Sequence, residues 1–191
     1  MPVQIILASS SPRRKELLDQ IKVTYAVYPV DIDETPLPGE RPLDYVQRLA
    51  AEKSAACKEQ FKTEMPVLAA DTAVILGAVI MGKPKDKADA MAMLSQLSGK
   101  THQVYSAVSL RWRGHIQAVS ITEVTFRRLT VREIQDYWHT GEPVDKAVGY
   151  ANQGMGGVFV QSIKGSFSGV VGLPLFETAE IFSKQGIELF K

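Results

Sequence analysis

Residues 5–18 read Ile-Ile-Leu-Ala-Ser-Ser-Ser-Pro-Arg-Arg-Lys-Glu-Leu-Leu. The apolar run predicts a buried strand, which breaks into serines before a helix with Ser11 as N-cap and Pro12 as first residue. The free N–H groups of that first turn carry partial positive charge, and Arg13 and Arg14 add two full charges. The stretch therefore predicts a phosphate-binding loop. An ordinary capped surface helix with solvated arginines explains the same residues, and this stretch alone does not separate the two readings.

The composition limits the class of protein. The chain has 191 residues, with 22 Lys and Arg against 21 Asp and Glu, so its net charge is +1. General nucleic-acid binders carry a basic excess, so no stable nucleic-acid partner is expected. No signal peptide and no apolar stretch of bilayer length is visible, so we expect no membrane association. The single cysteine, Cys57, cannot form an internal disulfide and falls in a predicted helix, which suits a buried thiol in a cytoplasmic protein.

Beyond the first helix, the hydrophobic pattern alternates between strands and helices. Two short apolar runs around Gly77 predict a β-hairpin over residues 73–81. A glycine-rich segment over residues 145–157 predicts a loop whose backbone approaches a ligand closely. Further strands are expected over residues 23–30, 67–72, 103–112, 115–126 and 158–163, and helices over residues 42–61, from Asp86 to Ser98, from Thr130 to His139 and from Pro174 onward.

Several charged residues stand in unusual places. The apolar run that begins at Val67 ends in Asp71 and Thr72, and ligands of open α/β sheets bind just beyond the carboxyl ends of strands. Asp71 is therefore a site candidate, although a turn-forming aspartate is the plain alternative. Lys53 falls close to the apolar stripe of its helix, which is expected only if it snorkels or reaches an anion. Lys83 stands between a glycine and a proline, which predicts a fixed, extended backbone.

Common catalytic and cofactor motifs are missing from the sequence. There is no GxGxxG after a strand and no GxxxxGK[ST], so neither dinucleotide nor Walker-type binding is supported. The three histidines are scattered and there is only one cysteine, so no zinc-ligand spacing is present. The serines at positions 9–11 lack a GxSxG elbow, which makes a serine hydrolase a weak hypothesis.

What remains is a set of carboxylates and cations that suits phosphate-ester chemistry. Mg²⁺ or Mn²⁺ binds one or two carboxylates together with substrate phosphates. Arginine and lysine neutralise charge on the leaving group, and a carboxylate can orient or deprotonate the attacking water. Each of these residues can also be a solvated surface charge when taken alone. The members of the set are Arg13, Arg14, Asp33, Glu34, Lys53, Asp71 and Lys83.

A series of short motifs runs in order along nearly the whole chain. They are Ser9-x-Ser11-Pro12-Arg13-Arg14, Asp33-Glu34, Ala50-x-x-Lys53, Ala70-Asp71-Thr72, Gly82-Lys83-Pro84, Asp145-Lys146-(x)₃-Tyr150-x-x-Gln153-Gly154 and Val171-Gly172-Leu173-Pro174-Leu175. This ordered set resembles the Maf family of nucleotide pyrophosphatases. The resemblance implies one Maf-like domain over residues 1–191, of α/β class. Its mixed, strongly twisted sheet would carry flanking helices that form two lobes around a cleft, as in inosine triphosphate pyrophosphatases.

The resemblance also implies an enzyme that hydrolyses a nucleoside triphosphate to the monophosphate and pyrophosphate with a divalent metal, Mg²⁺ or Mn²⁺. Asp71 matches the water-activating carboxylate, and Glu34 matches the second acidic position near metal and phosphate. The expected catalytic residues are Asp71, Glu34, Lys53 and Lys83, and the expected metal ligands are Asp71 and Glu34. The expected substrate-binding residues are Ser9, Ser11, Arg13, Arg14, Thr72 and Gln153.

Substrate choice is expected to follow from three of these positions. Arg13, Thr72 and Gln153 match the residues that separate the dTTP/UTP subgroup from the subgroup acting on 7-methyl-GTP, and they take the dTTP/UTP form here. The amide of Gln153 can donate to and accept from a uracil or thymine edge. Val148 and Asn152 depart from the family pattern and leave fine specificity open. The alternatives are a 7-methyl-GTP pyrophosphatase and a non-catalytic regulator of septation that binds nucleotides or DNA. A homodimer is expected from the family.

Overall fold

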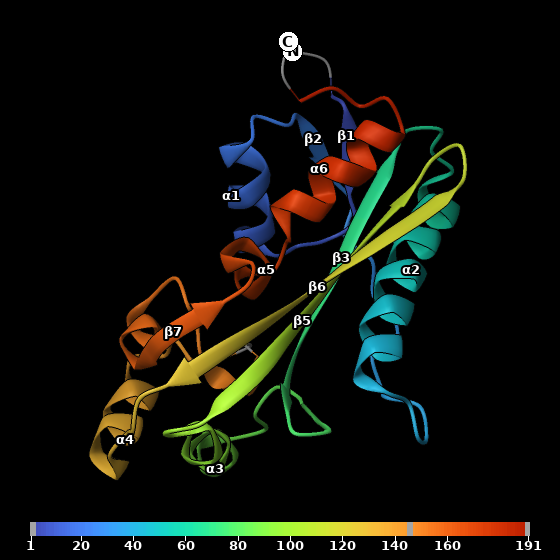
Figure 1. Ribbon diagram of the computed structural model, residues 1–191. Helices are drawn as coiled ribbons and strands as arrows, with labels where there is room; N and C mark the ends of the chain where they lie inside the picture. The colour runs from blue at the N-terminus through green and yellow to red at the C-terminus, as the bar shows by residue number, and fades with distance from the viewer. Residues whose placement is uncertain (1–2, 145–146, 190–191) are drawn as a thin grey trace.

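The computed structural model describes residues 3–144 and 147–189 (Figure 1). Within them, seven strands pair in the order β2-β1-β3-β5-β6-β7, and β4 pairs with β3 outside that path. β1 runs parallel to β2 and β3, whereas the remaining pairs are antiparallel. The predicted α/β class with a mixed sheet is confirmed. The strands are β1 (Ile5–Leu7), β2 (Tyr25–Val27), β3 (Val67–Leu76), β4 (Val79–Met81), β5 (Thr101–Arg111), β6 (His115–Phe126) and β7 (Val160–Lys164).

Helices cover both faces of the sheet. They are α1 (Pro12–Gln20), α2 (Pro42–Phe61), α3 (Lys87–Leu97), α4 (Val131–His139), α5 (Phe167–Val171) and α6 (Leu175–Lys184), with 3-10 turns η1 (Ala147–Gly149) and η2 (Met155–Phe159). α2 packs on one face, whereas α1, α5 and α6 pack on the other. Figure 1 shows α1 and α6 toward one end of the long strands, α3 and α4 at the opposite end, and α5 between these two groups.

The strand that carries Asp71 is longer than the sequence predicts. The pattern predicts a strand over residues 67–72, but β3 continues without a break to Leu76, so the predicted end is wrong. The physical reason is that β5 pairs with β3 past this point, so the backbone at Asp71 is part of the same ladder as its neighbours. The end of β3 is also the first arm of the predicted hairpin, which is confirmed: Val74 pairs with Met81, and Gly77 makes the turn with a φ of +63°.

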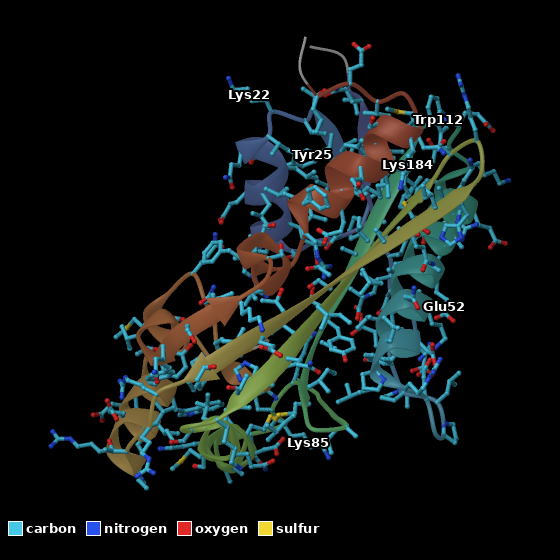
Figure 2. All side chains as sticks on the ribbon, in the orientation of Figure 1. Lys22, Tyr25, Glu52, Lys85, Trp112 and Lys184 are labelled. Carbon is cyan, nitrogen blue, oxygen red and sulfur yellow. The ribbon has the colours of Figure 1, made fainter. Side chains whose placement is uncertain are left out.

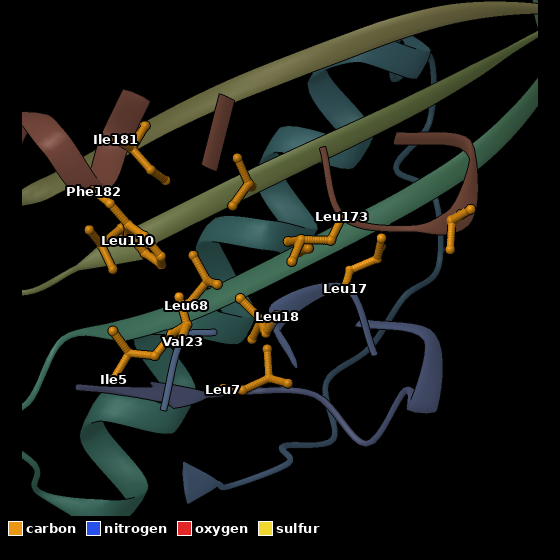
Figure 3. Close-up of a cluster of buried hydrophobic side chains, with 13 residues drawn as sticks. Ile5, Leu7, Leu17, Leu18, Val23, Leu68, Leu110, Leu173, Ile181 and Phe182 are labelled. Atoms are coloured by element: carbon orange, nitrogen blue, oxygen red, sulfur yellow. The ribbon is translucent and has the colours of Figure 1, made fainter. Parts of the chain in front are cut away.

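The predicted strand, serine loop and helix near the N-terminus are confirmed as β1, the loop and α1. Ser11 lies at the N-cap position, but its side chain makes no capping hydrogen bond. Its backbone N–H instead donates to Ser9 Oγ at 3.2 Å. Behind this loop lies an apolar cluster (Figure 3), in which Leu7, Leu18 and Phe182 are fully buried. Truncating such a side chain to alanine costs about 2–5 kcal/mol, so the cluster firmly ties β1 and α1 to the last helix.

The last third of the chain departs from the predicted pattern in two places. The strand expected over residues 158–163 begins later, because its first two residues belong to η2. Residues 167–171, for which the pattern predicts no helix, form α5. Its N-cap is Ser166, whose Oγ accepts from the Gly169 N–H at 3.0 Å. The final helix expected after Pro174 is confirmed as α6.

The other sequence predictions agree with the structure to within a few residues. The two long strands expected around Arg113 and Gly114 are β5 and β6, and the strand expected over residues 23–30 is present as the shorter β2. Cys57 is fully buried in α2, where burial raises the pKa of its thiol, as expected for an inert cysteine. In the part of the chain that the structure describes, no helix has the length and apolar character needed to cross a membrane.

Candidate active site

A cavity of about 420 Å³ lies beside the middle of β3. Its walls come from the β1–α1 loop, the start of α1, the β2–α2 connection, α2, β3, the connection after β4, β5, the loop before η2, and the end of α5. Segments from both ends of the sheet therefore meet here. Of the ten site residues predicted from the sequence, nine line the cavity: Ser9, Ser11, Arg13, Arg14, Glu34, Lys53, Asp71, Thr72 and Lys83.

The cavity lies where one edge of β3 has no strand beside it. β1 pairs with β3 only at Val67 and Leu68, and β4 pairs with it only from Val74 to Leu76. Between these two segments, no strand of the described residues covers that edge of β3. Asp71 thus reaches the cavity from the side of a strand and not from its end. The serine loop, by contrast, follows the carboxyl end of β1, where ligands of open α/β sheets bind.

Lys53 joins two carboxylates in the wall of the cavity. Its Nζ lies 2.7 Å from Asp71 Oδ1 and 2.6 Å from Glu34 Oε1. The side chains of Lys53 and Asp71 are 11% and 9% exposed, whereas that of Glu34 is 47% exposed. Of the two explanations for a lysine near the apolar stripe of α2, the structure supports the one in which it reaches an anion.

The elements that carry this ion pair explain why it forms. Alternate residues of a strand point to opposite faces, and Asp71 shares the face on which Ala73 and Ile75 pack against α2. Lys53 is buried on the side of α2 that meets this face, whereas the next residue toward the N-terminus, Glu52, points to solvent (Figure 2). The helical spacing of α2 and the alternation of side chains along β3 therefore place the Lys53 ammonium against the Asp71 carboxylate.

The charges of the cavity also shift the pKa values of its residues. Desolvation raises the pKa of the Glu34 carboxyl, but the hydrogen bond and charge of Lys53, with the charges of Lys83 and Arg14, outweigh it, so the pKa is lower than usual. Desolvation lowers the pKa of the Arg14 guanidinium, and the charge of Asp71 opposes this change. Glu34 is therefore ionised at neutral pH.

Arg14 ties the serine loop to the distant end of the chain. Its Nη1 donates to Ser9 Oγ at 3.1 Å, and its Nε donates to the carbonyl oxygen of Gly172 at 2.9 Å. Gly172 has a φ of +133°, a backbone angle that residues with a side chain rarely adopt. A glycine is therefore required here to direct this carbonyl toward Arg14. The Gly172 carbonyl is a part of the site that the sequence does not assign, although Gly172 belongs to the motif at residues 171–175.

The remaining predicted residues divide into a hydroxyl and two cations. Thr72 points to the face opposite Asp71, where its Oγ1 lies 2.9 Å from Ser106 Oγ and 3.5 Å from the Gly172 carbonyl oxygen. Arg13 and Lys83 both line the cavity. Neither takes part in an ion pair within the described residues, so both cations are available to an anionic ligand.

One predicted residue lies elsewhere. Gln153 is exposed and is not part of the cavity lining, so its role in base recognition stays a prediction. Its neighbour Asn152 does line the cavity, together with Tyr150. In the sequence, the only signal for Asn152 is that it departs from the family pattern. Asp145 and Lys146 of the same motif lie outside the described residues.

A family model described as "Maf-like protein" matches residues 4–185. The chain belongs to the Maf-like family. A dTTP/UTP pyrophosphatase of Pasteurella multocida is 49% identical, with 98% of this chain and 98% of the relative covered. A protein of the same name from Methylococcus capsulatus is 50% identical, with coverage of 97% and 92%. Another from Anaeromyxobacter dehalogenans (strain 2CP-C) is 50% identical, with coverage of 99% and 97%.

This member of the Maf family also has distant likenesses among solved structures. One is the crystal structure of a nucleoside-triphosphatase / dITP/XTP pyrophosphatase from Mycobacterium abscessus, with a TM-score of 0.47 and 14% identity. It covers 96% of this chain and 95% of that chain.

The cavity of this Maf-family member is lined by cationic side chains that can bind an anion. It is also lined by carboxylates that can accept a proton or bind a metal cation. Arginine and lysine on several sides of a cavity suit a polyphosphate, whose charge is spread along its length. Among the described residues, no group of three or more His, Cys, Asp and Glu side chains is placed to hold a metal ion. Glu34 and Asp71 are the carboxylates that line the cavity.

Proposed function

We propose that this chain is a nucleoside triphosphate pyrophosphatase that hydrolyses dTTP and UTP to the monophosphate and pyrophosphate. The observation that carries the proposal is the Glu34–Lys53–Asp71 group, which faces the same cavity as the serine loop and Arg14. The names of relatives 49–50% identical over nearly the whole chain support the substrate class.

The cationic residues would hold the triphosphate. Arg14 is already oriented by Ser9 and Gly172, so it offers a fixed guanidinium with little entropy left to lose. Lys83 is free of ion pairs within the described residues and adds charge on another wall of the cavity. When pyrophosphate leaves, negative charge develops on the oxygen that bridged the α- and β-phosphates, and these cations stabilise it.

Asp71 would accept the proton of the attacking water. The water oxygen attacks the α-phosphorus, the bond from that phosphorus to the bridging oxygen breaks, and pyrophosphate leaves with the electron pair. Lys53 engages Asp71 Oδ1 at 2.7 Å and holds the carboxylate in position. Among the described residues, no hydrogen bond engages Oδ2, so this oxygen is the one that can take the proton.

The chemistry of the two carboxylates fits Mg²⁺ or Mn²⁺. Both ions prefer hard oxygen ligands, and Mg²⁺ is usually bound by one or two carboxylates plus substrate phosphates. Glu34 and Asp71 converge on one ammonium, so their oxygens already lie close together, and Glu34 is open to solvent. These two residues would hold the ion. When bound, a divalent cation neutralises phosphate charge and lowers the pKa of bound water.

Base selection, quaternary structure and location belong to the same proposal. Arg13 and Thr72 line the cavity, and we assign them to contacts with the base or sugar.

Residues 1–191 would form one domain with two lobes, since β3, β5 and β6 connect the groups of helices at their two ends. A homodimer is supported by the exposed aromatic rings of Phe167 and Phe176. A cytoplasmic location is supported by the lone, buried Cys57.

A nucleotide panel tests the proposal. The protein is incubated with dTTP, UTP, CTP and 7-methyl-GTP in the presence of Mg²⁺ or Mn²⁺, and pyrophosphate is measured. We expect pyrophosphate from dTTP and UTP, with loss of activity when the metal is chelated. Absence of pyrophosphate from every pyrimidine triphosphate would contradict the proposal. Preference for 7-methyl-GTP would assign the chain to that activity instead.

A further inference from the structure

Thr72 is the residue through which the middle of β3 shows a hydroxyl to the cavity. Among residues 67–75 it alone is not buried, and it lines the cavity. Alternate residues of a strand share a face, so Thr72 lies beside Val74, with which Val104 of β5 pairs. Both valines and Tyr150 also line the cavity. Thr72 is thus the polar neighbour of an apolar wall, which suits the flat face of a nucleobase.

Ser106 determines the direction in which Thr72 gives its proton. It pairs with Thr72 from the neighbouring strand and is fully buried, outside the cavity lining. Ser106 Oγ lies 2.6 Å from the carbonyl oxygen of Gly169 and 2.9 Å from Thr72 Oγ1. A carbonyl oxygen can only accept, so Ser106 gives its single proton to Gly169. The hydrogen bond between the two hydroxyls is therefore donated by Thr72.

The second contact of the Thr72 hydroxyl leads to the same direction. Thr72 Oγ1 lies 3.5 Å from the carbonyl oxygen of Gly172, which also can only accept. Both contacts therefore draw the one proton of Thr72 toward the protein. What the hydroxyl offers to the cavity is its lone pairs, so Thr72 is an acceptor for a ligand and not a donor.

The packing of α5 holds the carbonyl on which this direction depends. Gly169 lies in the last turn of α5, where carbonyl groups have no partner within the helix and need a donor from elsewhere. A Cβ on Gly169 would lie 3.1 Å from Ser166 Oγ and 3.2 Å from Ser120 Oγ, so the glycine allows α5 to approach the sheet closely. The Ser106 proton is therefore committed before a ligand arrives.

A fixed acceptor distinguishes two kinds of pyrimidine. Uracil and thymine carry a proton at N3, whereas cytosine has a lone pair there. An acceptor that cannot turn binds the N3–H and repels the lone pair. The amide of Gln153, which we expect to contact the base, has a donor end and an acceptor end and can turn to suit either edge. Selection against cytosine therefore requires a second group of fixed polarity beside Gln153.

We propose that Ser106 is a positioning residue that fixes Thr72 as the acceptor for the pyrimidine N3–H and thereby excludes cytosine nucleotides. This inference rests on the proposed function and deepens it. Ser106 does not touch the substrate but acts through the Thr72 hydroxyl. Without the Ser106 oxygen, that hydroxyl is free to turn and donate to N3 of cytosine.

The test compares two ligands on four proteins. The ligands are the α,β-methylene analogues of UTP and CTP, which cannot release pyrophosphate. Binding is measured by calorimetry with Mg²⁺ for wild type, Ser106→Ala, Thr72→Val and the control Ser109→Ala. Ser109 is a matched control because it is a fully buried serine of the same strand outside the cavity lining. Its Oγ lies 2.9 Å from Ser54 Oγ and 2.9 Å from His115 Nε2.

We expect wild type and Ser109→Ala to prefer the UTP analogue by about tenfold or more. Ser106→Ala should reduce this preference to about threefold or less, by binding the CTP analogue more tightly than wild type does. Thr72→Val should also reduce it, by binding the UTP analogue less tightly. A general loss of folded protein lowers both affinities alike, so a merely structural role for Ser106 predicts no gain for the CTP analogue.

A preference that persists in Ser106→Ala or in Thr72→Val would overturn the inference, and so would equal binding of the two analogues to wild type. A contact of Thr72 with the sugar gives the same contradicting result, because the two analogues share the ribose. Since Thr72 lies at the wall of the cavity, Thr72→Val keeps the test decisive even if Ser106→Ala does not fold. Hydrolysis of UTP is assayed separately, so that failure of the proposed activity is seen as bound analogue without turnover.

Discussion

Arg14 and Gly172 are 158 positions apart in the sequence, yet the Arg14 Nε donates to the Gly172 carbonyl oxygen at 2.9 Å. The same guanidinium donates to Ser9 Oγ through Nη1. One side chain therefore joins the loop after β1 to the segment between α5 and α6. Because a guanidinium is planar and carries several donors in fixed directions, it can make both bonds and still face the cavity.

Replacement of Arg14 by lysine should weaken substrate binding while keeping the charge. An ammonium is a point charge without a planar fork, so it cannot reproduce both hydrogen bonds. We expect KM for UTP to rise by about tenfold, with a smaller change in kcat. Steady-state kinetics measure this, with Arg41→Lys as the control, because Arg41 is exposed and pairs only with Asp44. An unchanged KM would show that the guanidinium geometry is not used.

Asp71→Asn should nearly abolish turnover and leave the fold intact. The amide has almost the same shape as the carboxylate but cannot accept a proton from water, and general-base groups contribute about 10²–10⁴-fold to rates. We expect kcat to fall by about a thousandfold, with little change in circular dichroism. Asp44→Asn, on the surface, is the matched control and should keep full activity. Activity close to wild type in Asp71→Asn would remove Asp71 from its assigned role.

Lys53→Met should destabilise the protein as well as inactivate it. The substitution leaves the Asp71 carboxylate buried without its cation, and breaking a buried ion pair in this way costs about 3–5 kcal/mol. The double variant Lys53→Met, Asp71→Asn should recover part of that loss, because the unpaired charge is gone. Urea unfolding of the three proteins at neutral pH measures both effects. Strict additivity of the two substitutions would contradict the proposed coupling.

His102 should make stability depend on pH. It is 1% exposed, and burial lowers its pKa to about 4 from the ordinary 6.5. The folded protein therefore favours the neutral ring, so its contribution to stability is complete above pH 6.5 and is lost as pH falls toward 4. Between pH 7.5 and 5, His102 should remove about 2 kcal/mol from the free energy of unfolding.

Denaturant unfolding of wild type and His102→Phe at both pH values measures the His102 contribution. Burial also lowers the pKa of His115, so a smaller loss in the same direction should remain in the variant. The window stops at pH 5 to stay above the range in which carboxylates such as Glu34 take up protons. An equal loss of stability in the two proteins would show that His102 is not the titrating group.

How far the sequence predicts the site depends on how local each contact is. The contact between Lys53 and Asp71 follows from a helical stripe and a neighbouring strand, so the periodicity of the two segments already marks both residues. The bond between Arg14 and the Gly172 carbonyl has no local signal, because a carbonyl carries no side-chain identity and its direction depends on a positive φ. The sequence marks the arginine, but the folded chain is needed to find its partner.

Two details of the fold also lie beyond pattern analysis. β3 runs through Asp71 because β5 pairs with it there, and a polar residue within an apolar run resembles a strand end when its partner strand is unknown. α5 is too short for helical periodicity and contains β-branched valines, so its Ser166 cap and its packing determine it. The placement of Asn152 rather than Gln153 in the cavity depends on backbone angles that adjacent sequence positions do not reveal.

The open edge of β3 has a mechanical consequence. β3 and β5 pass the cavity without interruption, and the cavity draws residues from both ends of these strands. The two sides of the cavity are thus joined by continuous pleated backbone, not by a linker with a hinge. Any change in the distance between Arg14 on one side and Lys83 on the other must therefore be distributed as twist over several residues of the sheet.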